Sequence, residues 1–113
     1  MKLLDNTMSN KLISFLYHEV TDDIKSTGFQ TIGAIPYKHS ISHFKDDLTL
    51  ILNQFEKSEN IINLTNRDKS GLILTFDDEG KSAINIANIL RDKNLIGHFF
   101  ITTSMIGKST LLF

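Results

Sequence analysis

The stretch Gly-Leu-Ile-Leu-Thr-Phe-Asp-Asp-Glu-Gly, residues 71–80, decides the fold. It opens with a nearly continuous apolar run, which is typical of a central strand in a parallel sheet covered on both faces. The run ends abruptly at Asp77 and Asp78. Because parallel α/β sheets bind ligands beyond the carboxyl ends of their strands, this acidic pair is the first candidate for chemistry.

Two other apolar runs predict strands at residues 12–17 and 97–102, and two stripes at helical spacing predict helices. Ser40 or Ser42 is available as the N-cap of the first helix, and the second is expected to run to about Lys93. The first stripe consists of Phe44, Leu48, Ile51, Leu52 and Phe55, and the second of Ala83, Ile84, Ala87 and Leu90.

Strand, helix and strand follow one another between residues 71 and 102, which predicts a βαβ unit, a parallel sheet and an α/β fold. The polar stretch 21–41 contains the only proline and is expected to be a long loop. Residues 1–11 are expected to form an N-terminal tail ahead of one domain over residues 12–113.

Length and composition exclude several classes of function. The 113 residues suffice for one small domain or part of a larger one. A formal charge of −1 argues against a nucleic-acid partner, because such domains usually carry a basic excess. The absence of cysteine leaves His, Asp and Glu as the residues that can bind a metal. No apolar run is long enough for a membrane span and no export signal is recognisable, so we expect no membrane partner and slightly favour the cytoplasm.

Adjacent carboxylates at a strand end can divide a reaction between them. One can bind a divalent metal while the other takes a proton from water, because like charges and a metal separate their pKa values. The alternative is an acidic strand exit without chemistry, in which an aspartate caps the following helix or faces solvent. The two aspartates alone leave both interpretations open.

The residues around the pair carry a resemblance. The segment 72–82 resembles the Thr-Phe-Asp-Asp-Gly motif of the polysaccharide deacetylase family, the NodB-homology carbohydrate esterases. Residues 17–20 (Tyr-His-Glu-Val) look like the segment that follows the first strand in many members, and residues 97–101 (Gly-His-Phe-Phe-Ile) look like a later strand. Phe44 with Leu48 resembles the first amphipathic helix, so the similarity covers roughly residues 12–107.

The resemblance implies a deformed (β/α) barrel and metal-dependent hydrolysis of an N-acetyl group on a carbohydrate. By position, Asp77 matches the general base and Asp78 matches a metal ligand. The implied cofactor is a divalent metal, zinc in the first place, and the implied substrate is an acetylated amino sugar.

The sequence departs from the family in two places. Glu79 occupies the position of the motif glycine, and we interpret it as a bystander rather than a further ligand. The family's two histidine ligands belong to a later motif that does not occur before Phe113. We therefore expect an incomplete, N-terminal part of the barrel that is inactive alone. The alternative is a non-catalytic α/β remnant or interaction module, with self-association through exposed strand edges.

The histidines outside that motif have competing interpretations. His39 and His43 have the spacing of a metal pair on a helix, but we favour His39 as a loop end and His43 as a surface residue of the first turn. His18 can reach the mouth of the site or form an ordinary hydrogen bond, and His98 is expected to be structural.

Two rival classes fail on position. A response-regulator receiver needs a later aspartate at a strand end, but the only Asp downstream of Asp78 is Asp92, inside the second helical stripe. Residues 80–82 and 107–109 both read Gly-Lys-Ser, like the end of a phosphate loop, but the glycine required five residues earlier is a threonine in each case.

Overall fold

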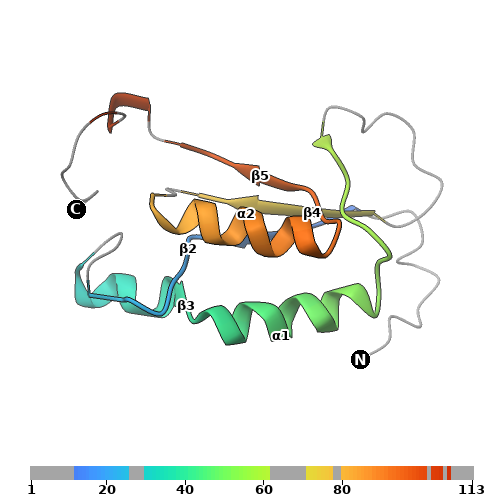
Figure 1. Ribbon diagram of the computed structural model, residues 1–113, viewed down its shortest axis with the longest axis horizontal. Coiled ribbons are helices and arrows are strands. Elements are labelled where there is room, and N and C mark those ends of the chain that lie inside the picture. Colours follow the sequence, from blue (N-terminus) through green and yellow to red (C-terminus); the bar gives the residue numbers. More distant parts are fainter. Residues whose placement is uncertain are drawn as a thin grey trace.

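The computed structural model describes residues 12–25, 30–61, 71–77, 80–101, 103–105 and 107. Its centre is a parallel sheet with the strand order β1-β4-β5 (Figure 1). The strands are β1 (Leu12–Tyr17), β4 (Gly71–Phe76) and β5 (Gly97–Phe99). The chain is therefore a mixed α/β fold, as the βαβ spacing predicted.

The strand predictions are confirmed for β1 and β4, whose bounds match the two apolar runs. Register places Tyr17 beside Phe76 and Phe76 beside Phe99. The third strand is shorter than predicted and ends at Phe99. Its neighbour β4 ends at Phe76, so the backbone beyond Phe99 has little left to pair with, and the Phe100 amide makes one last bond to the Phe76 carbonyl at 2.8 Å.

Helices α1 (Ile41–Leu52) and α2 (Ser82–Asp92) lie on the same side of the sheet (Figure 1). Every second strand residue points toward them, because side chains alternate across a strand. The buried cluster between the helices and the sheet consists of Tyr17, Val20, Phe44, Leu48, Ile51, Phe55, Leu72, Leu74, Phe76, Ile86, Leu90 and Leu95. None of the described helices is long and apolar enough to cross a membrane.

The opposite face of the sheet carries the intervening residues. Leu12 and Leu16 of β1 lie there and are 44% and 56% exposed, whereas Ile73 of β4 is buried. Parallel sheets are usually covered on both faces. Neither α1 nor α2 covers this second face, which we call the open face (Figure 1).

The structure confirms the expected start of α1. Ser40 is its N-cap, and its hydroxyl accepts a hydrogen bond from the His43 amide at 3.1 Å. Phe44 and Leu48 are fully buried on the predicted stripe, whereas Phe55 is buried beyond the end of the helix.

The predicted stripe of α2 is wrong in part. The residues of α2 that are buried are Ser82, Ile86 and Leu90, whereas Ile84 is 70% exposed. Asn85, Asn88 and Asp92 form a polar side, but the apolar residues spread over a broad arc that includes both Ile84 and Ile86, so spacing alone does not select the buried part of that arc. The small Ser82 takes the core-facing place in the first turn, and Ile86 follows it one turn later.

The prediction of one long loop over residues 21–41 is also wrong. This stretch contains the 3₁₀ helix η2 (Ile32–Tyr37) and the strand β3 (Lys38–His39), while residues 26–29 lie outside the described part. β3 pairs in parallel with β2 (Glu19–Val20), which follows β1 after one residue. The Thr21 amide extends this pairing with a 2.8 Å bond to the His39 carbonyl.

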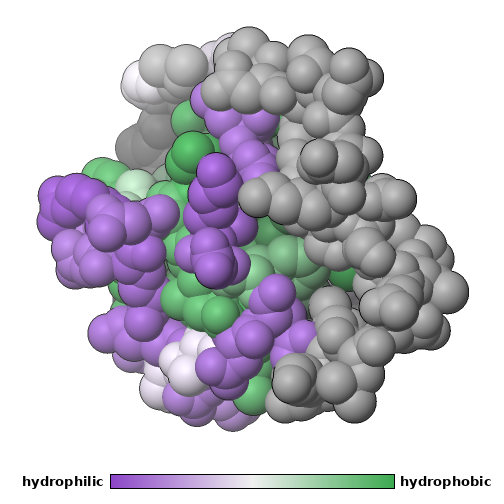
Figure 2. Space-filling model, turned by 90° about the vertical axis from the view of Figure 1, so that its right-hand side faces the viewer, coloured by the Kyte–Doolittle hydropathy of each residue, from purple (hydrophilic) through white to green (hydrophobic). Residues whose placement is uncertain are grey.

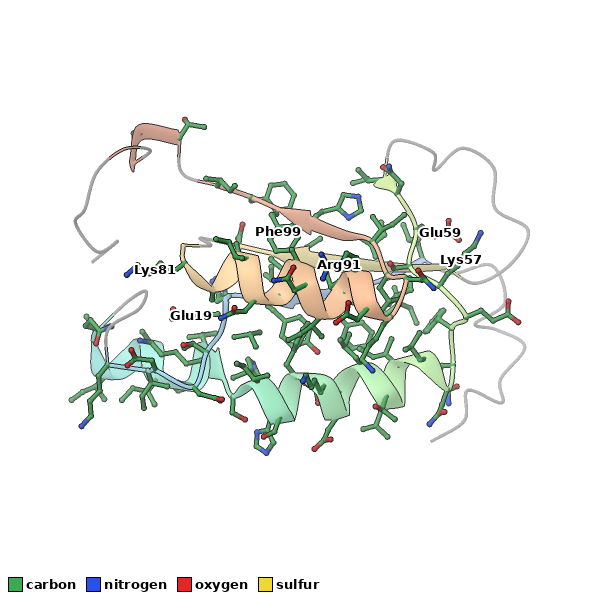
Figure 3. All side chains as sticks on the ribbon, in the orientation of Figure 1. Glu19, Lys57, Glu59, Lys81, Arg91 and Phe99 are labelled. Atoms are coloured by element: carbon green, nitrogen blue, oxygen red, sulfur yellow. The ribbon has the colours of Figure 1, made fainter. Side chains whose placement is uncertain are left out.

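Residues 58–61 run across the beginning of the sheet, and we call them the strap. The Glu59 amide donates to the Leu72 carbonyl at 2.7 Å, and the Ser58 hydroxyl donates to the Ile96 carbonyl at 2.7 Å. Figure 2 looks onto this end and shows hydrophobic residues gathered in its middle, flanked by hydrophilic ones. Figure 3 places Glu59 and Lys57 at the same end, opposite the end where the strands stop.

Candidate functional site

Asp77 lies directly beyond the carboxyl end of the central strand. Its amide donates to the Tyr17 carbonyl of β1 at 2.9 Å. The preceding residue, Phe76, accepts through its carbonyl from the Phe100 amide on the other side. These bonds fix the backbone at Asp77 between both neighbouring strands, and its side chain is partly exposed. The predicted base therefore stands where ligands of parallel sheets bind.

The structural alternative for this residue is helix capping. The N-cap of α2 is Lys81, which has no side-chain capping bond, and the Ala83 amide bonds to the Gly80 carbonyl at 3.1 Å. Asp77 is therefore not the cap of α2. Asp78, the predicted metal ligand, and Glu79 lie outside the described residues, so their roles stay predictions.

Tyr17 belongs to the core rather than to a solvent-facing site. Its ring stacks on Phe76 with centroids 5.7 Å apart, and its hydroxyl donates to Asp47 Oδ2 at 3.2 Å. Burial, followed by the charge of Asp47 and this hydrogen bond, raises the pKa of the Tyr17 phenol well above its usual range. Tyr17 therefore stays protonated and positions the start of the next segment.

His18 follows at the strand end and is partly exposed. Its ring meets the Tyr37 ring edge-on, with centroids 5.2 Å apart and an interplanar angle of 67°. The residue before it accepts a hydrogen bond from the Asp77 amide, so His18 lies at the same end of the sheet as Asp77. Both interpretations of His18, an approach to the site mouth and an ordinary hydrogen bond, stay predictions.

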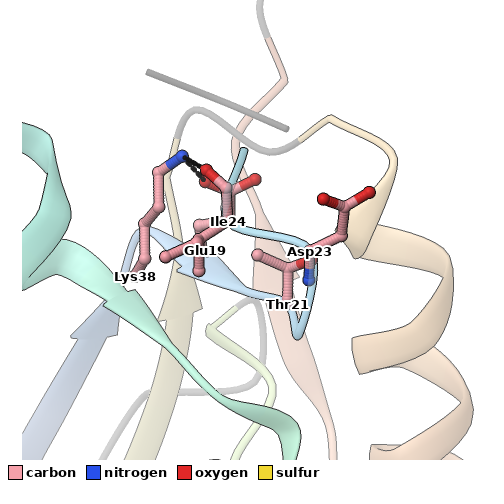
Figure 4. Close-up of polar contacts among 5 residues, drawn as sticks. All are labelled: Glu19, Thr21, Asp23, Ile24 and Lys38. Atoms are coloured by element: carbon pink, nitrogen blue, oxygen red, sulfur yellow. Dashed lines mark hydrogen bonds and ion pairs between the residues drawn. The ribbon is translucent and has the colours of Figure 1, made fainter. Parts of the chain in front are cut away.

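A buried ion pair lies near the same end and was missed by the sequence reasoning (Figure 4). Lys38 Nζ stands 3.6 Å from Glu19 Oε2 and donates to the Ile24 carbonyl at 2.7 Å. The Lys38 side chain is 3% exposed and that of Glu19 is 12% exposed. The two residues are register partners of β2 and β3, and opposite charge at paired positions is the signal that could have indicated them.

His39 and His43 do not share a helix face. His39 lies in β3, where its ring meets Tyr17 edge-on at 5.4 Å between centroids. His43 is exposed in the first turn of α1. His43 is thus a surface residue of the first turn, as expected, whereas the expectation of His39 at a loop end is wrong because His39 pairs in β3. The two rings therefore do not form a pair on one helix face.

His98 has the structural role that was expected. Its Nε2 accepts from the Ile61 amide of the strap at 3.0 Å, and its Nδ1 lies 3.3 Å from the Leu74 carbonyl. An amide can only donate and a carbonyl can only accept, so this network assigns the neutral tautomer with the proton on Nδ1. His98 therefore joins β4, β5 and the strap.

The described residues do not by themselves fit a zinc centre. Within them, no group of three or more His, Asp or Glu side chains converges closely enough to hold a metal ion. An open groove of about 420 Å³ runs along α2 and β5, lined among others by Leu90, Arg91 and Phe99, but Asp77 does not line it. No protein-family model, curated protein or solved structure matches the chain.

Proposed function

We propose that this chain is part of a polysaccharide deacetylase-like hydrolase that removes an N-acetyl group from a carbohydrate, with Asp77 as the general base. The observation that carries the proposal is the position of Asp77. It follows the central parallel strand, and backbone hydrogen bonds from Asp77 to β1 and from Phe100, just beyond β5, to Phe76 fix the chain at this point. An aspartate held there at the end of an apolar strand has the location that such a base requires.

The reaction adds water across the amide bond. The Asp77 carboxylate takes a proton from the attacking water, the oxygen bonds to the acetyl carbon, and the carbon–nitrogen bond breaks. The proton is passed to the leaving nitrogen, so the products are acetate and the free amino sugar. The Asp77 side chain is partly exposed, as a base that meets water and substrate must be.

The proposal includes a divalent metal, zinc in the first place, with Asp78 as one ligand. When bound, such an ion would polarise the acetyl carbonyl and acidify water. Because a catalytic zinc usually has about three protein ligands, its other ligands must come from outside the described residues.

We further propose that the sheet is one sector of a deformed (β/α) barrel. The open face supports this, because a barrel directs one face of its sheet toward its own interior and places its helices on the other. Here α1 and α2 share one side, and Leu12 and Leu16 line the other.

The test is release of acetate from an N-acetylglucosamine oligomer by the longer hydrolase of which we propose this chain to be part, measured with and without added Zn²⁺. The Asp77→Asn variant should lose about 100-fold or more of the rate, since a positioned base contributes at least that much. Asp92→Asn is the matched control, because the Asp92 side chain is 72% exposed on α2 and pairs with the neighbouring, equally exposed Arg91 at 3.5 Å. Equal rates for wild type and Asp77→Asn would refute the role of Asp77.

The second candidate is a non-catalytic module that self-associates through the open face. The exposure of Leu12 and Leu16 favours it, because apolar residues on a sheet face are normally covered. Light scattering should show a dimer that Leu16→Lys weakens. Ile84→Lys is the control, since Ile84 is 70% exposed on α2. A wild-type chain that stays monomeric at high concentration contradicts this candidate.

A further inference from the structure

Tyr37 has an unusual position for a large aromatic residue. It is the last residue of η2 and is 58% exposed. Its ring meets the edge of the His18 ring, with 5.2 Å between the ring centroids. Tyrosine combines an apolar ring with a polar end, and exposed rings of this kind are used for recognition.

A ring contact and a backbone hydrogen bond link Tyr37 to the candidate site. Tyr37 touches His18, and the residue before His18 accepts a hydrogen bond from the Asp77 amide at 2.9 Å. The exposed ring therefore stands beside the end of the sheet at which Asp77 lies.

The ring is also held in place from behind. Lys38 follows Tyr37 directly, and its side chain is 3% exposed, paired with Glu19 and bonded to the Ile24 carbonyl. The same residue pairs with Glu19 in the β2–β3 ladder. The backbone next to the exposed ring is thus fixed by a buried ion pair and by strand pairing, so the ring needs little reorganisation to bind a flat apolar surface.

The geometry points to Tyr37 as a platform on which a sugar ring of the substrate stacks while a neighbouring acetamido group reaches Asp77. This inference rests on the proposed function and assigns to Tyr37 the contact with a second sugar unit of the oligomer. A pyranose ring offers an apolar face of C–H groups, and an aromatic ring is the protein surface that matches it. Asp77 and Tyr37 then contact different sugar units of one oligomer.

The experiment uses an N-acetylglucosamine oligomer and the aromatic NMR signals of tyrosine. The chain contains two tyrosines and no tryptophan. Tyr17 is 6% exposed and Tyr37 is 58% exposed, so ligand-induced shifts should affect the Tyr37 signals and leave those of Tyr17 in place. We expect Tyr37→Ala to weaken binding about tenfold and Tyr37→Phe to retain it, because stacking needs the ring and not the hydroxyl.

Ile32→Ala is the matched control, because Ile32 begins the same 3₁₀ helix and is 88% exposed. Binding that weakens only in Tyr37→Ala supports the platform. Equal affinity in wild type and Tyr37→Ala overturns it and leaves the proposed function intact if acetate release persists. Absence of oligomer binding to the wild type also overturns it. The effect of Asp77→Asn on acetate release tests the proposed function and does not bear on the platform.

Discussion

Replacing Gly97 by alanine tests how closely α2 packs on β5. A Cβ added at Gly97 would lie 2.5 Å from Leu90 Cδ1 and 2.9 Å from Phe76 Cε2. Carbon atoms in contact are normally about 3.5–4.0 Å apart, so both neighbours must move. Phe76 is fully buried and Leu90 is 2% exposed, so neither can turn into solvent.

The expected cost follows from these contacts. Overpacking a close-packed core costs about 1–3 kcal/mol, and two buried neighbours place Gly97→Ala in the upper half of that range. Replacing glycine also restricts the unfolded chain, which offsets about 0.4–1 kcal/mol. The free energy of unfolding should therefore fall by about 1–2.6 kcal/mol. With a urea slope of about 1 kcal/mol per M for a small domain, the midpoint should fall by roughly 1–2.6 M.

Urea unfolding followed by far-ultraviolet circular dichroism measures this change. Gly33→Ala is the matched control, because no atom lies within 4 Å of a Cβ built at Gly33. Leu90→Val in the Gly97→Ala background should cost less than Leu90→Val alone, since it shortens the side chain that clashes. A Gly97→Ala midpoint equal to or above that of the wild type would refute the reasoning.

Two further predictions concern buried polar groups. Glu19→Gln should lower the free energy of unfolding by about 2 kcal/mol, because it removes the carboxylate charge that lies 3.6 Å from the buried Lys38 ammonium. Glu56→Gln, at an exposed position, is the control in the same urea experiment. Equal midpoints for both variants would show that the Glu19–Lys38 pair contributes little. The raised pKa of Tyr17 means that its contribution to stability is complete below the unfolded pKa of about 10 and is lost as pH rises above it, because only the unfolded chain then ionises. The stability difference between wild type and Tyr17→Phe should therefore shift in favour of Tyr17→Phe above about pH 10, and a difference that is constant across this range would contradict the prediction.

The parts of the fold that the sequence predicts well are those that local pattern determines. Continuous apolar residues identify β1 and β4, and Ser40 marks the start of α1 by a capping bond that spans three residues. The buried side of α2 was predicted less well, because alanine and isoleucine occur on several of its sides and contact with the sheet decides among them.

Features that depend on pairing distant residues were not predicted. β2 and β3 are two residues long each, which is too short to show a periodic pattern. They form where the chain after β1 lies beside the residues that precede α1. The Glu19–Lys38 pair follows from that register. Within the candidate site, the sequence located Asp77 at the strand end, but the ring contact between His18 and Tyr37 required the three-dimensional arrangement.

The bonding of His98 makes this side chain an internal reference for metal titrations. A metal ion binds the lone pair of an imidazole nitrogen, and the one lone pair of the neutral ring already accepts the Ile61 amide proton. Coordination would require detaching the strap from β5. In NMR spectra recorded during zinc addition, the His98 signals should therefore stay fixed while the signals of residues that bind the ion move. Loss of the His98 signals would report unfolding of the sheet rather than occupancy of a metal site.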